Sequence, residues 1–364
     1  MAMNQTNTPT PPTPVAPPPA GAGVTSPIVV VRAAATVLVV YGFLVGLWTS
    51  RSGESLWLVD TVREWLNRPL GIGEDFGVLG VMLLLLAFGY QAAGMSAAER
   101  SPGRLGLAAL RLYLPVAVAV VLAAAALLVG ATVWVAPDAG EVSVADYLGN
   151  LVWAPHLVGD AIRLVPLAWV PLLAILALAM AAASAPLRAG AHWVPLGCQL
   201  AATGLLVWLG LAVPELARLG VVASFLPLVI LGQIVWSCRD NGMPTWVGVL
   251  LGTGCWAVVA LAEPAYPELD NWWYPLTTVF AVLFFLVAVQ CAGPVSQAVA
   301  RSAPARWLSS RSEWLLVLLG VVGFAATDLL TAALPPAVAL PLAVALLCGA
   351  AELCHLVTRA RRAG

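Results

Sequence analysis

Ten apolar stretches, nine of them close to 20 residues long and one of 30, follow one another along this chain of 364 residues. A helix of about 20 apolar residues crosses the roughly 30 Å of hydrocarbon in a bilayer, because each residue advances the helix by 1.5 Å. Only 10% of the residues are charged, too few to cover the surface of a water-soluble domain of this size. The sequence therefore predicts an all-α, polytopic integral membrane protein of about ten transmembrane helices, near 27–48, 76–96, 106–135, 165–186, 193–213, 219–237, 245–262, 274–293, 314–333 and 335–357.

The arginines predict which side of the membrane each helix end faces. The chain has no lysine, and cytoplasmic loops of membrane proteins carry an excess of basic residues. If both termini are cytoplasmic, 12 of the 17 basic residues lie at cytoplasmic helix ends: Arg32, Arg100, Arg104, Arg111, Arg188, Arg239, Arg301, Arg306, Arg311, Arg359, Arg361 and Arg362. The net charge of −1 thus combines two faces of opposite sign and argues against a nucleic-acid partner.

Three segments divide the chain. Residues 1–26 are uncharged and rich in proline, threonine and alanine, so we expect them to form a disordered cytoplasmic tail. Residues 27–358 are expected to form the ten-helix membrane domain, and residues 359–364 a short basic cytoplasmic tail. No positively charged segment precedes the first apolar stretch, as a cleaved signal peptide would require. The sequence predicts a multi-pass protein of the cell membrane.

Ionisable side chains inside the apolar stretches are the first functional candidates, because a charge at membrane depth costs about 2.5–3.5 kcal/mol. Arg32 lies about one turn into the first stretch and Arg111 into the third. The alternative for both arginines is that they extend to the cytoplasmic headgroups. Asp328 and Glu352 lie near span ends and are expected at the interface. Four glutamines either join helices by hydrogen bonds or line a polar cavity: Gln91, Gln199, Gln233 and Gln290.

The outer loop 136–164 contains the two candidate catalytic residues, His156 and Asp160. A spacing of four places both on one face of a helix, where they can act as acid and base. The alternative is a solvated pair in a loop. The sequence has no glycine-rich phosphate loop, no Gly-x-Ser-x-Gly motif and no metal-ligand spacing, so we expect neither a metal site nor a permanently bound cofactor.

Five places in the sequence resemble the acyltransferase-3 family. An arginine opens the first apolar run, Phe-Gly-Val-Leu-Gly opens the second, and a basic segment with Arg-Leu-Tyr-Leu-Pro leads into the third. A Leu-Ala-Trp element opens the fourth run, and Arg-Trp-Leu-Ser approaches the ninth. The order and spacing of these elements carry the likeness, and they lie at 28–41, 76–80, 104–115, 167–169 and 306–312. The resemblance implies a ten-helix membrane enzyme that takes an acyl group from a cytoplasmic thioester and esterifies a carbohydrate.

Two positions depart from the family pattern where its chemistry needs histidine. Eleven helical residues advance about 1100°, so positions 32 and 43 share one helix face about 16 Å apart. The family has an arginine and a histidine at these positions, whereas this chain has Arg32 and Phe43. The later family histidine, seven residues after Ser312, is replaced by Leu319. A phenylalanine cannot accept the proton of an attacking hydroxyl, so the usual mechanism cannot operate here.

The sequence therefore predicts a divergent acyltransferase-3-like protein whose activity as an enzyme is open. Its cytoplasmic half is expected to hold an acyl thioester of the acyl-CoA type through Arg32 and Arg111, with Tyr113 beside them, because guanidinium groups bind phosphate oxygens in pairs. The expected partners are the bilayer, a glycolipid or polysaccharide acceptor, and proteins of envelope assembly. The alternatives are a non-catalytic scaffold or a lipid- or glycolipid-binding subunit of an envelope-building complex, and a transporter or flippase.

Overall fold

The computed structural model describes residues 26–53, 55–71, 76–96, 99–131, 133, 142–158, 161–184, 193–270, 274–291 and 293–360. These residues are helical or in turns and loops, and none of them lies in a β-strand. The predicted tail before Ser26, the last four residues of the predicted basic tail, and Asp160 lie outside the described residues.

All ten predicted stretches contain a helix. The first half of the chain forms helices α1 Ser26–Val40, η1 Tyr41–Gly46, α2 Leu47–Ser52, α3 Trp57–Val62, η2 Arg63–Asn67, α4 Arg68–Leu70, α5 Gly77–Gly94, α6 Pro102–Leu128, α7 Val144–Leu151, α8 Ala154–Leu157 and α9 Trp169–Ala183. The second half forms α10 Val194–Ala212, η5 Pro214–Leu216, α11 Ala217–Ala223, α12 Leu226–Asp240, α13 Thr245–Ala265, α14 Pro267–Asp270, α15 Tyr274–Gln290, α16 Pro294–Arg301, α17 Ala303–Leu318, η6 Leu319–Gly323, α18 Phe324–Thr331 and α19 Pro336–Ala360.

Eight helical segments in the described part of the chain are long and apolar enough to cross a membrane, and α15 with α16 gives a ninth if the pair is counted as one span. The remaining predicted span corresponds to α9, which is apolar but only 15 residues long. The chain is an all-α polytopic membrane protein, as its sequence predicts.

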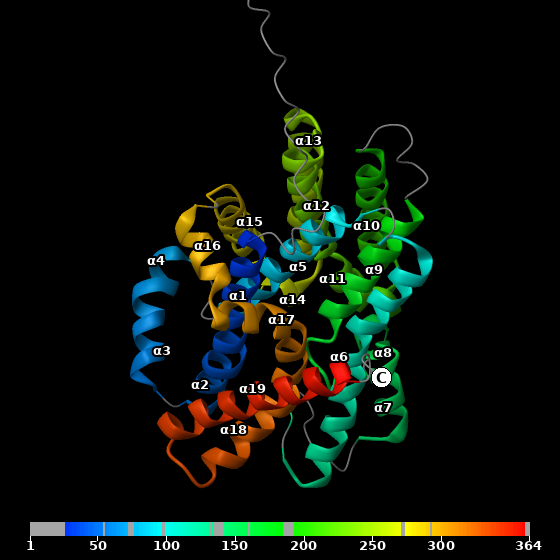
Figure 1. The fold of residues 1–364 in the computed structure, drawn as a ribbon. Coiled ribbons are helices and arrows are strands. Elements are labelled where there is room, and N and C mark those ends of the chain that lie inside the picture. Colours follow the sequence, from blue (N-terminus) through cyan, green and yellow to red (C-terminus); the bar gives the residue numbers. More distant parts are fainter. Residues whose placement is uncertain are drawn as a thin grey trace, which may run out of the picture.

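Helix α5 occupies the centre of the bundle and packs against α1, α9, α12 and α15 (Figure 1). Two glycines allow α5 and α12 to cross at close range. A Cβ atom added at Gly89 would lie 2.0 Å from the carbonyl oxygen of Val229, and one added at Gly232 would lie 2.1 Å from that of Leu86. The close approach replaces side-chain packing with backbone contact, as in many membrane helix pairs.

Polar contacts join helix ends in two separate groups. The start of α1 pairs with α17 through Arg32 and Glu313, and the end of α19 pairs with α17 through Glu352 and Arg311. Arg311 and Glu313 are two residues apart on α17, so they point to opposite sides of that helix, one toward α19 and the other toward α1. That both termini are cytoplasmic stays a prediction from the arginine distribution.

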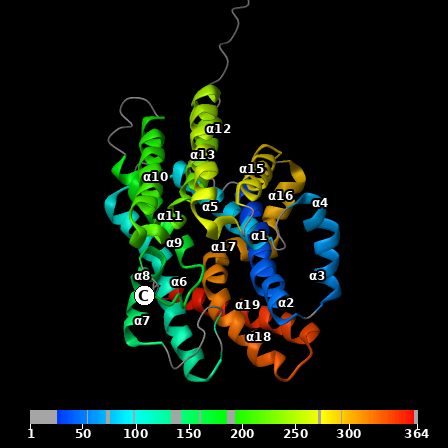
Figure 2. The ribbon, with the colours of Figure 1, turned by 180° about the vertical axis from the view of Figure 1, so that it is seen from behind.

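Helices α3, η2 and α4 form an arm at the periphery, beside α1 and α2 and away from α6 to α9 (Figures 1 and 2). Trp57 is 79% exposed and Trp65 is 72% exposed on this arm. Exposed tryptophans are typical of a surface that meets the lipid headgroups.

Candidate functional site

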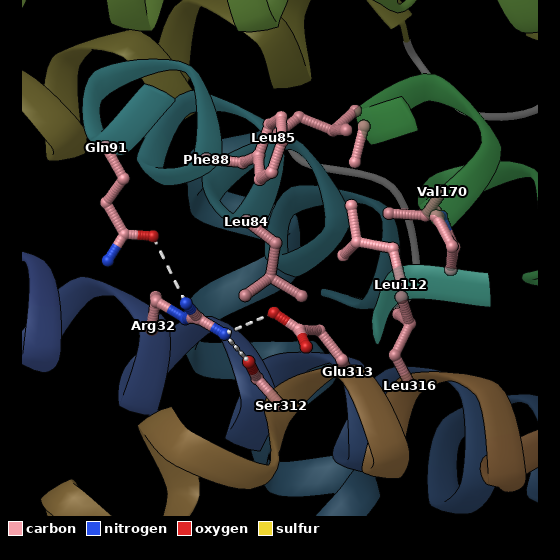
Figure 3. Close-up of a pocket in the computed structure, with 12 residues that line it drawn as sticks. Arg32, Leu84, Leu85, Phe88, Gln91, Leu112, Val170, Ser312, Glu313 and Leu316 are labelled. Carbon is pink, nitrogen blue, oxygen red and sulfur yellow. Dashed lines mark hydrogen bonds and ion pairs between the residues drawn. The ribbon is translucent and has the colours of Figure 1, made fainter. Parts of the chain in front are cut away.

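A mainly apolar cavity of about 40 Å³ lies between α1, α5, α6, α9 and α17. Space of this size holds a few water molecules at most, so a larger ligand enters only if the lining side chains move apart. Apolar side chains form its walls: Leu84, Leu85 and Phe88 of α5, Leu112 of α6, Val170, Pro171 and Ala174 of α9, and Leu316 of α17. Its polar end consists of Arg32, Gln91, Ser312 and Glu313 (Figure 3). We call this space the Arg32 cavity.

Helical spacing explains why these residues line one space. Leu84, Phe88 and Gln91 are four and three residues apart, so they lie along one face of α5. Ser312 and Leu316 are related in the same way on α17. Helices α5 and α17 therefore present polar residues near one end of the cavity and apolar residues along the rest.

Arg32 joins three helices at the polar end. Its Nη1 donates to Oε1 of Gln91 at 3.1 Å, and its Nη2 donates to Oγ of Ser312 at 2.6 Å and to Oε1 of Glu313 at 3.0 Å (Figure 3). The Arg32 side chain is 18% exposed, whereas that of Glu313 is 42% exposed. The Nε–H of Arg32 is buried and has no acceptor in the described part of the chain. A buried donor without a partner marks a place that a ligand group or a water molecule can satisfy.

The three predicted donor-binding residues do not share this cavity. Arg32 lines it, but Arg111 is exposed on α6, and its neighbour Leu112 is the residue that faces the cavity. Tyr113 instead contacts Trp153 edge to face, with ring centroids 5.2 Å apart. Only Arg32 among the three is therefore placed to touch a molecule inside the cavity.

Phe43 and Leu319 both lie in short π-helical segments, η1 and η6. The α-helical geometry assumed for residues 32–43 thus gives way to a π-helix at Tyr41. Both side chains are buried, and a Cβ atom added at Gly77 would lie 2.7 Å from Cδ2 of Phe43. The two segments pack together, since a Cβ atom at Gly323 would lie 3.3 Å from Cδ1 of Leu44. Single π-helical turns often occur at functional sites, but apolar side chains fill the space where η1 and η6 meet.

His156 lies away from the Arg32 cluster, in the short helix α8, and is buried. The predicted solvated loop pair is therefore wrong for His156. Helix α8 ends at Leu157 and Val158 is extended, while Asp160 lies outside the described residues, so its pairing with His156 stays a prediction. Nε2 of His156 donates to the carbonyl oxygen of Val165 at 3.1 Å, because a carbonyl can only accept. Burial, followed by the charge of Arg163, lowers the pKa of His156 to about 4, so its ring is neutral at pH 7.

Three of the four glutamines take the predicted roles, whereas Gln290 is exposed at the end of α15. Gln91 bonds to Arg32 and lines the Arg32 cavity. Gln233 donates to Oε1 of Gln199 at 2.9 Å, and both line a separate, more polar cavity that borders α10 and α12. Glu313 was missed, because an acidic residue at a span end resembles an interface residue. Its position next to Ser312, on the helix that faces Arg32, was the available signal.

No protein-family model, no curated protein and no solved structure matches this chain. The likeness to acyltransferase-3 enzymes thus stays a prediction. Function has to be inferred from the geometry of the Arg32 cavity.

Proposed function

We propose that this chain is an acyltransferase-3-like membrane protein that binds an acyl-bearing, phosphate-containing amphiphile in the Arg32 cavity. The ligand class comprises acyl thioesters of the acyl-CoA type and phosphate-bearing lipids or glycolipids. The observation that carries the proposal is the single guanidinium at one end of an otherwise apolar cavity within the bundle.

The two ends of the cavity match the two parts of such a molecule. Leucine, valine and phenylalanine walls remove an acyl chain from water, which contributes about 0.8 kcal/mol for each buried methylene. Arg32 supplies charge-assisted hydrogen bonds for an anionic head, and its unsatisfied Nε–H supplies a further donor. The flanking Gln91 amide and Ser312 hydroxyl can accept or donate to the polar groups between head and chain.

Binding is better supported than acyl transfer. Transfer to a hydroxyl requires a base beside the reacting atoms, and the cavity lining in the described residues includes no histidine. Glu313 is the one carboxylate of that lining, and it is engaged with Arg32. The positions of the family histidines hold Phe43 and Leu319, which are packed in the core. The protein is in this respect a pseudoenzyme, suited to a binding subunit of an envelope-building complex.

Equilibrium binding of radiolabelled palmitoyl-CoA to the purified protein in detergent tests the proposal. We expect saturable binding by the wild type and at least tenfold weaker binding by Arg32→Gln. Arg104→Gln is the matched control, since Arg104 is exposed on α6 and does not line the cavity. Phosphatidylglycerol as a competitor separates a lipid ligand from an acyl thioester. Absence of saturable binding of both molecules would refute the proposal.

A steric pair tests the apolar part separately from the charge. Ala174→Phe places a ring in the cavity from α9, whereas Ala182→Phe places the same ring on the exposed side of the same helix. We expect Ala174→Phe to abolish palmitoyl-CoA binding and Ala182→Phe to leave it unchanged. Equal effects of the two variants would show that the ligand does not occupy this space.

A further inference from the structure

A second cavity of about 60 Å³ lies beyond the start of α9, between the α8 loop, α11, α12 and α14. It is lined by Arg163, Arg218, His156 and Glu268 and by two aromatic rings, Trp169 and Phe225. Trp169 lines this space while its neighbour Val170 lines the Arg32 cavity. The two cavities therefore lie on different sides of the first turn of α9, because adjacent helical residues point about 100° apart.

The charges around this second cavity do not balance. Arg163 and Arg218 contribute two positive charges and Glu268 contributes one negative charge, while His156 is neutral at pH 7. Burial, and then the charge of Arg218, lower the pKa of Arg163, whereas Glu268 opposes the shift. Two like charges that are partly removed from water favour an anion between them.

The two arginines differ in the hydrogen bonds that they make. Arg218 holds the loop, since its Nη1 donates to the carbonyl oxygens of Pro155 at 2.9 Å and Ala161 at 3.3 Å. Arg163 follows in the same loop and donates to no acceptor in the described ranges of the chain. Glu268 is the one carboxylate among the described residues that line this cavity, and its charge attracts Arg163. The planar guanidinium group of Arg163, with its five N–H donors, is suited to bind an additional oxyanion.

The apolar side of the cavity is aromatic and rigid. Trp169 and Phe225 are buried, with ring centroids 4.7 Å apart, and Phe225 contacts Tyr274 edge to face. The faces of these rings are electron-rich and do not attract an anion, but they offer a flat apolar surface to a carbon skeleton. The cavity thus has a charged side and an apolar side.

We propose that this cavity binds the anionic group of a phosphate- or carboxylate-bearing molecule, with Arg163 and Arg218 as its ligands and the Trp169–Phe225 rings against its uncharged part. The anion is either the headgroup of a lipid or a water-soluble anion. This inference goes beyond the function proposed above, since it needs no ligand in the Arg32 cavity.

Two probes distinguish the sources of the anion. The first is inorganic phosphate, added to the purified protein in neutral detergent at constant ionic strength, with the shift in thermal unfolding temperature as the readout. The second is phosphatidylglycerol compared with phosphatidylcholine, with retained lipid counted by native mass spectrometry. Stabilisation by phosphate identifies a water-soluble anion, and selective retention of phosphatidylglycerol identifies a lipid headgroup.

Arg163→Gln should weaken binding of the effective probe at least tenfold. Arg163→Lys keeps the positive charge and should weaken binding of the probe less than Arg163→Gln does. Arg68→Gln should leave binding of the probe unchanged, because Arg68 is exposed on α4 and does not line the cavity. The unfolding temperature without probe shows whether each variant is folded. The proposal is overturned if neither probe binds the wild type, or if Arg163→Gln and Arg68→Gln bind alike. Palmitoyl-CoA binding at the Arg32 cavity, measured on the same samples, separates the failure of one site from that of the other.

Discussion

Arg32 and Glu313 form an ion pair in which removal of either partner should have opposite effects on ligand affinity. If an anionic head binds the Arg32 guanidinium, Glu313 competes with that head for the same Nη2 donor. Glu313→Gln removes the competing charge and should tighten binding of palmitoyl-CoA. Arg32→Gln removes the donor and should weaken it.

The exposure of each side chain sets the sizes of these effects. Glu313 is 42% exposed, so its attraction to Arg32 is largely screened and is worth about 1 kcal/mol at most. Loss of that competition therefore predicts up to about fivefold tighter binding. Arg32 is only 18% exposed, and a hydrogen bond to a charged group contributes about 1.5–3 kcal/mol. Its loss predicts binding that is weaker by about 10- to 150-fold.

Filter or scintillation-proximity binding of palmitoyl-CoA to the two variants measures both effects. The Arg311–Glu352 pair is the matched control, because it joins α17 to α19 at 2.9 Å without lining the cavity. Arg311→Gln and Glu352→Gln should lower the unfolding temperature but leave the affinity unchanged. If Arg32→Gln and Glu313→Gln shift the affinity in the same direction, the pair only ties the helices together and the ligand reasoning is refuted.

Three further predictions concern the fold. The folded-state pKa of His156, about 4, lies below the unfolded value of about 6.5 because of burial, so acidification from pH 6.5 to 4 protonates the unfolded chain first. Urea unfolding should show a stability loss of up to about 3 kcal/mol over that window, and His156→Gln should lack it. Gly89→Ala should destabilise the protein by about 1–3 kcal/mol, because its Cβ atom would meet Val229 of α12. Gly106→Ala should stabilise the protein slightly, because no atom lies within 4 Å of the added Cβ. Thermal unfolding of the two variants measures both effects. In a cysteine-free background, Gly103→Cys and Val295→Cys should react with a membrane-impermeant maleimide only after the cytoplasmic side is opened, and labelling of intact cells would contradict the orientation.

The helices were predictable because the lipid imposes a simple rule on apolar length. Each of the ten predicted stretches contains a helix, and even the short α9 lies where Trp169 opens an apolar run. The π-helical segments were not predictable, since their extra residue is accommodated by tertiary packing around Phe43 and Leu319, which no local pattern encodes.

The site was predictable only in part. Arg32 stood out because it is a charge within an apolar stretch, and the structure places it in a cavity. Arg111 has the same local signature, yet the rotation of α6 turns Leu112 inward and leaves Arg111 exposed. Its orientation depends on which neighbours α6 packs against, and a single sequence does not contain that information. For His156, burial follows from contacts with Val165 across the loop.

A palmitoyl-CoA analogue with a photoreactive diazirine near the end of its acyl chain tests the central claim most directly. After irradiation of the purified protein, peptide mass spectrometry should find crosslinks in α5 around Leu84 and Phe88 or in α9 around Ala174, and Ala174→Phe should abolish them. Crosslinks confined to outward-facing residues such as Trp246 and Leu250 of α13 would contradict it, because they would show that the chain remains in the surrounding detergent or lipid.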